Sequence, residues 1–287
     1  MKDHPICTTC GTQFSGTQPV PDVCPICNDD RQFVNPNGQT WTNEDQLKNG
    51  HRVKITQLNE RLYTLKMEPE FAIGQRAFLV ISPNGNVLWD CIPLLDQPTI
   101  DFINSKGGLK AIAFSHPHFY SNINEWAAEF GCPVYVHHND KEFNFYPGKS
   151  IQHWQGEEMP IVDDIRIVHI GGHFPGSCML QIRTLSPGGT ILCGDTLYIS
   201  RSKRHTAVMY SYPNQIPLPR DEFSAMYKKC AALSFDTLYG PTFEGQELLG
   251  NAREIFERSM KRYIDNYHYK QLPHPALSKG EGSKILI

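Results

Sequence analysis

Histidine and aspartate side chains stand at three points where an apolar run gives way to a loop. His116 and His118 lie one residue apart in "AFSHPHFYS", His173 lies within "GGHFPGS", and Asp195 follows "TILCG". Imidazole and carboxylate groups are common ligands of Zn2+, Fe2+ and Mn2+. Each residue alone has an ordinary explanation as a hydrogen-bonded histidine or a turn aspartate. As a set, they predict a metal centre with these four residues as its ligands.

Four cysteines near the N-terminus form a second pattern with metal-ligand spacing. "CTTCG" supplies Cys7 and Cys10, and "CPIC" supplies Cys24 and Cys27, with 13 residues between the pairs. Each Cys-x2-Cys pair can direct two thiolates at one cation. The surrounding residues are too polar and too rich in glycine and proline to form a core, so the metal would supply the folding energy. We predict a structural zinc ribbon over residues 1–40. The alternative is a rubredoxin-like iron site, which would carry electrons.

The rest of the chain must place the histidines and Asp195 together. A short helix capped by Thr42 is expected first, and then strand-like runs, including "HRVKITQLN", "RLYTLKME" and "RAFLVISP". From Pro98 onward strands and helices alternate, and a final amphipathic helix is expected from Gln246 to about Asn266. A β-rich first half and an α/β second half suggest two sheets stacked face to face in one domain over residues 41–270, followed by a loose or docking tail over 271–287.

The bulk properties exclude several classes of partner. The chain has 287 residues, of which 40% are apolar, enough for a large core. Its net charge of -3 creates no field for nucleic acid or anionic membrane. No apolar run approaches the roughly 18 residues that span a bilayer, and the N-terminus lacks the apolar core of a signal peptide. We therefore expect a cytoplasmic protein that acts on a small molecule. Nothing in the sequence sets its oligomeric state.

The motifs resemble those of the metallo-β-lactamase superfamily of metal-dependent hydrolases, over roughly Lys54 to Gly240. They are "LWDC", "SHPHFYSN" in place of a His-x-His-x-Asp-His loop, "GGHFPGS", and "GDTLY". Together with the cysteine pairs and "MYSYPNQIPLP", they are similar to an uncharacterised branch that carries an N-terminal ribbon. The resemblance implies an αββα sandwich whose loops hold the metal.

Two departures from the superfamily pattern concern the metal count. Tyr120 and Ser121 stand where the second metal ion would find an aspartate and a histidine, and Pro241 or Thr242 stands where a late histidine would. We therefore expect one catalytic ion, with zinc favoured and iron or manganese as alternatives. Asp195 is either a fourth ligand or the residue that orients and deprotonates water. Tyr120 could act as a proton donor, bind the ion weakly or wall the pocket.

The favoured function is hydrolysis of a small ester, lactone, thioester or amide by a metal-activated water. Candidates for substrate contact, several of them on a segment from Ile199 to Pro219 that could close over an acidic or aromatic substrate, are Tyr198, Arg201, Tyr210, Tyr212 and His137. The alternative for that segment is an ordinary solvated connection. The alternatives for function are an iron enzyme that oxidises sulfur compounds and a non-catalytic binding protein.

Overall fold

The protein is built on two stacked β-sheets. Its structure, a computed structural model, describes residues 4–267, so the tail expected over residues 271–287 lies outside the described residues. The first sheet contains, in spatial order, β3 (Arg52–Asn59), β4 (Leu62–Glu68), β5 (Arg76–Val80), β6 (Val87–Trp89), β7 (Ala111–Ala113), β8 (Val134–His137) and β9 (Ile151–Trp154). The second contains β10 (Glu158–Val162), β11 (Ile165–His169), β12 (Cys178–Ile182), β13 (Thr190–Leu192), β18 (Thr237–Tyr239) and β19 (Glu247–Leu248).

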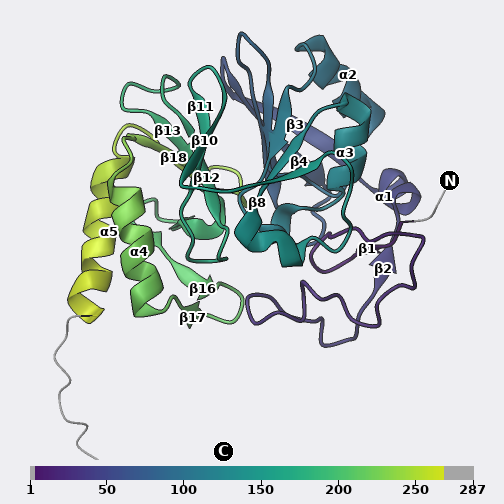
Figure 1. The fold of residues 1–287 in the computed structure, drawn as a ribbon, viewed down its shortest axis with the longest axis horizontal. Coiled ribbons are helices and arrows are strands. Elements are labelled where there is room, and N and C mark those ends of the chain that lie inside the picture. The colour runs from purple at the N-terminus through teal and green to yellow at the C-terminus, as the bar shows by residue number, and fades with distance from the viewer. Residues whose placement is uncertain (1–3, 268–287) are drawn as a thin grey trace, which may run out of the picture.

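Helices cover the outer face of each sheet. Residues of α1 (Glu44–Gly50), α2 (Gln97–Ser105) and α3 (Ile123–Phe130) share a core with the first sheet. Residues of α4 (Arg220–Ala231) and α5 (Ala252–Tyr267) share a core with the second. Figure 1 shows the resulting order of layers, with α4 and α5 on one side and α2 and α3 on the other. The αββα sandwich is therefore confirmed.

The alternation of side chains along each strand explains the three apolar layers. All of β5 is buried, and Ala77 and Leu79 pack toward the helices whereas Phe78 and Val80 pack between the sheets. In β13, Ile191 faces the helices and Leu192 faces the other sheet. A strand with both faces covered needs apolar residues at every position, which is why these runs are continuous. The five cysteines outside the N-terminal pairs are buried and free.

Short elements complete the fold at one edge of the sandwich. β1 (Ile6–Cys7) pairs with β2 (Trp41–Thr42) in the cysteine-rich segment. The segment expected as a loop after Ile199 instead contains two small hairpins, β14 (Tyr198–Ile199) with β15 (Thr206–Ala207) and β16 (Met209–Ser211) with β17 (Ile216–Pro217). In Figure 1 the purple N-terminal segment runs beneath the sandwich to reach β16 and β17.

Two expected helix boundaries are wrong. The side chain that caps α1 is Asn43 rather than Thr42, because the Asn43 carboxamide accepts a hydrogen bond from the Gln46 N–H. The last helix begins at Ala252 and not at Gln246, because Glu247 and Leu248 form β19 at the sheet edge. No helix among residues 4–267 is long and apolar enough to cross a membrane.

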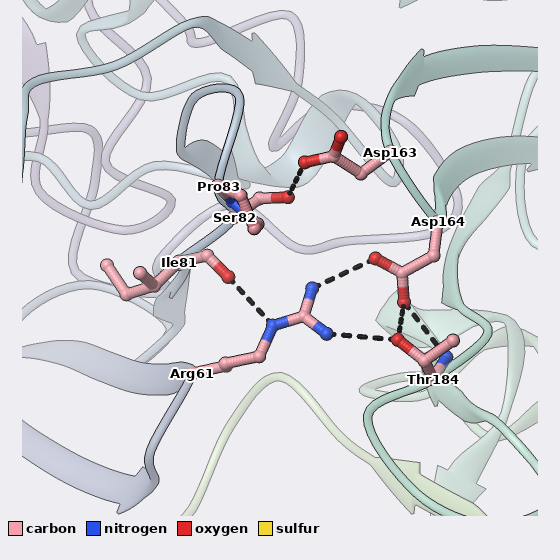
Figure 2. Close-up of a pocket in the computed structure, with 7 residues that line it drawn as sticks. All are labelled: Arg61, Ile81, Ser82, Pro83, Asp163, Asp164 and Thr184. Carbon is pink, nitrogen blue, oxygen red and sulfur yellow. Dashed lines mark hydrogen bonds and ion pairs between the residues drawn. The ribbon is translucent and has the colours of Figure 1, made fainter.

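A hollow of about 490 Å3 lies between turns of the two sheets. Figure 2 shows that its polar groups bond to one another: the Arg61 guanidinium donates to the Ile81 carbonyl, to Thr184 and to Asp164, while Ser82 donates to Asp163. Arg61 and Ser82 come from the first sheet, and their partners Asp164, Thr184 and Asp163 come from the second. The cluster therefore joins the two halves.

Candidate metal centre

The four predicted ligands converge on one point. Ligand atoms of His116, His118, His173 and Asp195 all lie within 4.8 Å of one another. Nε2 of His116 lies 3.2 Å from Oδ2 of Asp195, and Nε2 of His173 lies 3.9 Å from the same oxygen. Nε2 of His173 also lies 3.4 Å from Nδ1 of His118. The convergence predicted from three separate motifs is therefore confirmed.

These separations fit a metal ion. Bonds of about 2.0–2.1 Å in tetrahedral geometry place two ligand atoms roughly 3.3 Å apart. The three separations above lie near this value or slightly beyond it. Nε2 of His116 is buried, and despite its 3.2 Å approach to Asp195 it makes no hydrogen bond among the described residues, a costly arrangement unless the nitrogen binds something. Three imidazoles and one carboxylate suit zinc, iron or manganese.

The ligands come from the carboxyl ends of β7, β11 and β13, as the pattern predicted. His118 lies in a short 3-10 helix, Pro117–Phe119, whereas His116 just before it has an extended backbone. It therefore presents Nδ1 to the cluster, where His116 and His173 present Nε2. Asp195 lies in a second 3-10 turn, Gly194–Thr196.

A buried carboxylate supports His116 from behind. The Ser115 hydroxyl lies 2.8 Å from Nδ1 of His116 and 2.9 Å from both carboxylate oxygens of Asp90. Asp90 is fully buried, with a left-handed φ of 61°, and it also accepts from the Ser115 N–H. This chain holds the His116 ring so that Nε2 faces the other ligands. Burial raises the pKa of Asp90 well above its ordinary value.

Two contacts hold the Asp195 turn. Gly194 has a φ of +52°, and a Cβ added there would lie 2.4 Å from Cβ of Ser115, so glycine is required. Tyr212 donates a hydrogen bond of 2.8 Å to the Asp195 carbonyl. The carboxylate is thus fixed at the cluster while its side chain remains 17% exposed.

The protonation states of the ligands at neutral pH favour metal binding. Burial and the neighbouring His116 lower the pKa of His173 to about 3. Burial also lowers the pKa of His118 well below its ordinary value. Burial by itself would raise the pKa of Asp195, but contact with His116 and the proximity of His173 bring it below its ordinary value. At neutral pH His118 and His173 therefore offer free lone pairs and Asp195 a negative charge.

Three of the four ligands, His118, His173 and Asp195, form part of the lining of a cavity of about 310 Å3, which also includes Tyr198 and Tyr212. Both tyrosines were predicted substrate contacts. The other predicted contacts lie elsewhere. Tyr210 packs on Arg31, with the guanidinium 4.4 Å from the ring centroid. The guanidinium of Arg201 lies 4.9 Å from the ring centroid of Phe243.

His137 and Tyr120 are not among the residues that line the cavity. His137 is buried against His169, with ring centroids 3.9 Å apart, and against Trp154. Tyr120 is only 5% exposed and packs on Phe114 in the core beneath the first sheet. Its catalytic role stays a prediction that this position does not support.

The four N-terminal cysteines also meet. Their sulfur atoms all lie within 4.8 Å of one another, with 3.7 Å between Cys7 and Cys27 and 3.6 Å between Cys10 and Cys24. Zinc–sulfur bonds of about 2.3 Å in a tetrahedron place sulfurs roughly 3.8 Å apart. The Gln39 side chain donates to Cys7 at 3.2 Å. The cluster therefore fits one thiolate-bound metal ion.

Several residues of the site carried no role in the sequence prediction. Asp90 lies in the motif "LWDC", and only its place at the end of a strand marked it out. Ser115 is an ordinary-looking neighbour of His116. Arg31 and Gln32, which line the cavity from the N-terminal segment, showed no sequence pattern at all.

Known proteins share this fold. No family model matches the chain. Solved structures similar to it include the metallo-β-lactamase FIM-1 from Pseudomonas aeruginosa in its mono-zinc form (TM-score 0.53, 14% identity, covering 75% of this chain and 96% of FIM-1). They also include a metallo-β-lactamase from Erythrobacter litoralis with β-mercaptoethanol in the active site (TM-score 0.55, 13% identity, covering 74% of this chain and 96% of that protein).

The fold and the two ligand clusters define a protein of the metallo-β-lactamase fold with a His/Asp centre and an N-terminal four-cysteine segment. Within that class the chain belongs to the family of the uncharacterized protein YmaE of Bacillus subtilis. The two are 43% identical over 262 residues, which are 90% of this chain and 95% of YmaE.

Proposed function

We propose that the protein is a hydrolase with one catalytic metal ion, held by His116, His118 and His173 beside Asp195. The observation that carries the proposal is that these donors converge at the wall of a cavity that His118, His173 and the partly exposed Asp195 line. A divalent ion bound there would polarise a carbonyl group and make water more acidic.

The protein's own groups supply the remaining chemistry. Asp195 keeps a negative charge, so it can orient a water molecule and accept its proton. Ser115 and Asp90 fix the His116 ring, and the Tyr212 hydroxyl fixes the Asp195 main chain. These groups need no rearrangement during the reaction, which is the property of a preorganised site.

The proposal of a single ion rests on what stands where further ligands would be. The Ser121 hydroxyl accepts a hydrogen bond from Gln75 at 3.0 Å and is buried. Thr242 donates to the Gln246 side chain through both its N–H and its hydroxyl. Neither residue offers an imidazole or carboxylate. Outside the four ligands and the four cysteines, no cluster of three or more metal-ligating side chains occurs among residues 4–267.

The substrate class follows from the cavity. Its volume of about 310 Å3 is at the low end for small-molecule sites, and its walls include Ile73, Phe119, Tyr198 and Tyr212. We propose a small, partly apolar ester, lactone, thioester or amide. The similar solved structures are named β-lactamases, and a β-lactam is a cyclic amide, so this class includes such compounds.

The test is turnover by zinc-loaded protein on one probe of each class: p-nitrophenyl acetate, δ-valerolactone, an acetyl thioester and a chromogenic β-lactam. We expect hydrolysis of at least one probe, and a loss of about 100-fold or more with Asp195→Asn, because the variant keeps the shape of the residue but not its charge. His205→Ala is the control, since His205 is exposed and outside the cluster.

Failure of the zinc protein on every probe would overturn the proposal, as would full activity of Asp195→Asn. Oxygen consumption that requires iron, without hydrolysis, would favour the oxidative alternative.

A further inference from the structure

The N-terminal segment forms one wall of the metal cavity. Thr9, Arg31, Gln32 and Phe33 line it together with His118, His173 and Asp195. Arg31, Gln32 and Phe33 follow Cys27 closely, with Arg31 four positions after it. The cysteine cluster therefore anchors the part of the chain that reaches the cavity.

Arg31 joins this wall to the metal-ligand loop. Its Nε donates to the His173 carbonyl at 2.6 Å. Its guanidinium lies 4.4 Å from the ring centroids of both Phe174 and Tyr210, between the two. Nη1 also bonds to both carboxylate oxygens of Asp29, at 2.9 and 3.0 Å. The positive charge is therefore paired with a carboxylate of the same segment.

The hairpin β16–β17 holds the same stretch of backbone. Asn214 donates to the carbonyls of Asp30 and Gln32, at 2.9 and 2.8 Å, and the Ser211 hydroxyl donates to the Arg31 carbonyl at 3.2 Å. At the other side of the segment, Gln13 donates through its N–H to the Ser121 carbonyl. Hydrogen bonds on two sides thus hold the wall in place.

Gln32 is the unusual member of the wall. It is only 4% exposed, and its Oε1 is buried with no hydrogen-bond partner among residues 4–267. A buried amide oxygen without a partner costs free energy, and folding offers no benefit in return. Because the residue also lines the metal cavity, a bound molecule can supply the missing donor.

We propose that Gln32 is the specificity-determining residue of the metal site, and that it selects molecules with an uncharged hydrogen-bond donor, an amide or a hydroxyl, beside an apolar body. The apolar body fits the aromatic walls formed by Phe33, Tyr198 and Tyr212. Two cations of the segment from Ile199 to Pro219 are engaged elsewhere, Arg201 on Phe243 and Lys203 with Glu247. As a statement about substrates, the inference rests on the proposed hydrolase function, but the binding preference itself does not.

The experiment measures the binding of thiols to the zinc-loaded, full-length protein. The sulfur of each thiol coordinates the metal ion, and the rest of the molecule extends into the cavity. The probes are 3-sulfanylpropanamide, its apolar isostere 3-methylbutane-1-thiol and the anionic 3-sulfanylpropanoate, each with homologues one and two carbons longer. Calorimetry gives a dissociation constant for each.

We expect the amide to bind about tenfold more tightly than its isostere at one chain length or more, as one well-made hydrogen bond allows. Gln32→Leu should bring this ratio to about one. Gln32→Glu, which keeps an acceptor, should still prefer the amide to the carboxylate. Gln18→Leu, an exposed glutamine of the same segment, should behave as the wild type.

Stability separates this role from a structural one. Because Oε1 has no partner, Gln32→Leu should melt at the same temperature as the wild type or higher. A fall of several degrees would assign Gln32 a structural role and overturn the inference, as would a wild-type ratio near one at every chain length or a ratio unchanged in Gln32→Leu. If the wild type hydrolyses no probe yet shows the Gln32-dependent ratio, the proposed function fails and the inference stands.

Discussion

At the scale of single residues, we expect the hydrogen-bonded neighbours of His116 to decide how tightly this residue holds a metal ion. Its Nδ1 meets the Ser115 hydroxyl at 2.8 Å, and that hydroxyl is held by the buried Asp90 carboxylate. Groups of this kind orient a ligand and tune its basicity.

Ser115→Ala should therefore weaken metal binding at the His/Asp centre by about 10- to 100-fold while the protein stays folded. Competition with a chromogenic chelator measures the affinity. Ser105→Ala is the control, because the Ser105 hydroxyl lies on the exposed end of α2 and bonds only to the Phe102 carbonyl. Equal affinities in the two variants would remove Ser115 from the account.

His137 should make stability depend on pH. Burial is the main cause, and the neighbouring His169 the second, of a pKa of His137 that is lowered from 6.5 to about 4. The unfolded chain therefore takes up the proton first as the pH falls, and stability decreases from about pH 6.5 down to about pH 4. Urea unfolding at about pH 7 and pH 5 should show a loss of stability that is about 2 kcal/mol smaller in His137→Gln than in the wild type. Equal losses would mean that His137 titrates normally.

The ligands could be predicted from sequence because each follows an apolar strand within a short motif. The roles of Tyr120 and His137 could not, because the direction of a side chain at a strand end depends on packing. Tyr120 turns into the core beside Phe114, and His137 stacks on His169. Ser115 and Arg31 have hydrogen-bond partners in distant parts of the chain, so no local sequence pattern predicts these contacts.

At the scale of elements, the cysteine segment acts as part of the cavity. It contributes Arg31, Gln32 and Phe33 to the lining. Gly11 has a φ of +82°, and a Cβ there would lie 2.5 Å from Cγ of Pro93, so the segment packs very closely against the sandwich. We expect its fold to depend on a bound metal ion, since its core consists of the four cysteines with Phe14 and Ile26.

Cys24→Ser combined with Cys27→Ser should remove the metal of this segment and leave the one at the His/Asp centre. Without that anchor the wall should loosen, so the amide-to-isostere binding ratio should fall toward one. Metal content per chain and the thiol titration test both points. A double variant that retains the full binding ratio with one ion per chain would show that the segment folds without its metal.

The elements themselves were largely predictable where periodicity was strong. The strands β3 to β6 and helix α4 follow their apolar patterns. The predicted start of the last helix was wrong, because the chain there forms the edge of the second sheet. Leu248 of β19 pairs with Leu238 of β18, and Leu249 is 61% exposed. Gly250, with a φ of +77°, separates β19 from α5. The periodicity of apolar residues alone does not show that the helix begins only after this glycine.

At the scale of the whole molecule, the two halves must keep their relation, because His116 comes from the first sheet and His173 and Asp195 from the second. Away from the metal, Arg61 joins the halves by hydrogen bonds to Asp164 and Thr184. The Arg61 side chain is 27% exposed and that of Asp164 16%, so their pairing is partly shielded from water.

Arg61→Ala should lower the free energy of unfolding by about 2 kcal/mol, because it leaves a partly buried carboxylate without its cation. Arg52→Ala is the matched control. Arg52 pairs with Glu68 at the surface, where its side chain is 75% exposed, and its loss should cost less than about 0.5 kcal/mol. Chemical denaturation gives both values, and equal costs would show that the Figure 2 cluster does not hold the halves together.

The most direct test of the account is the number of metal ions per chain. Elemental analysis of the full-length protein, dialysed after loading with zinc, should give two ions, one for each ligand cluster. His116→Ala should give one and should lose all hydrolysis, and His205→Ala should still give two. A His116→Ala protein that keeps two ions or its turnover would contradict the assignment of the His/Asp cluster as the metal centre.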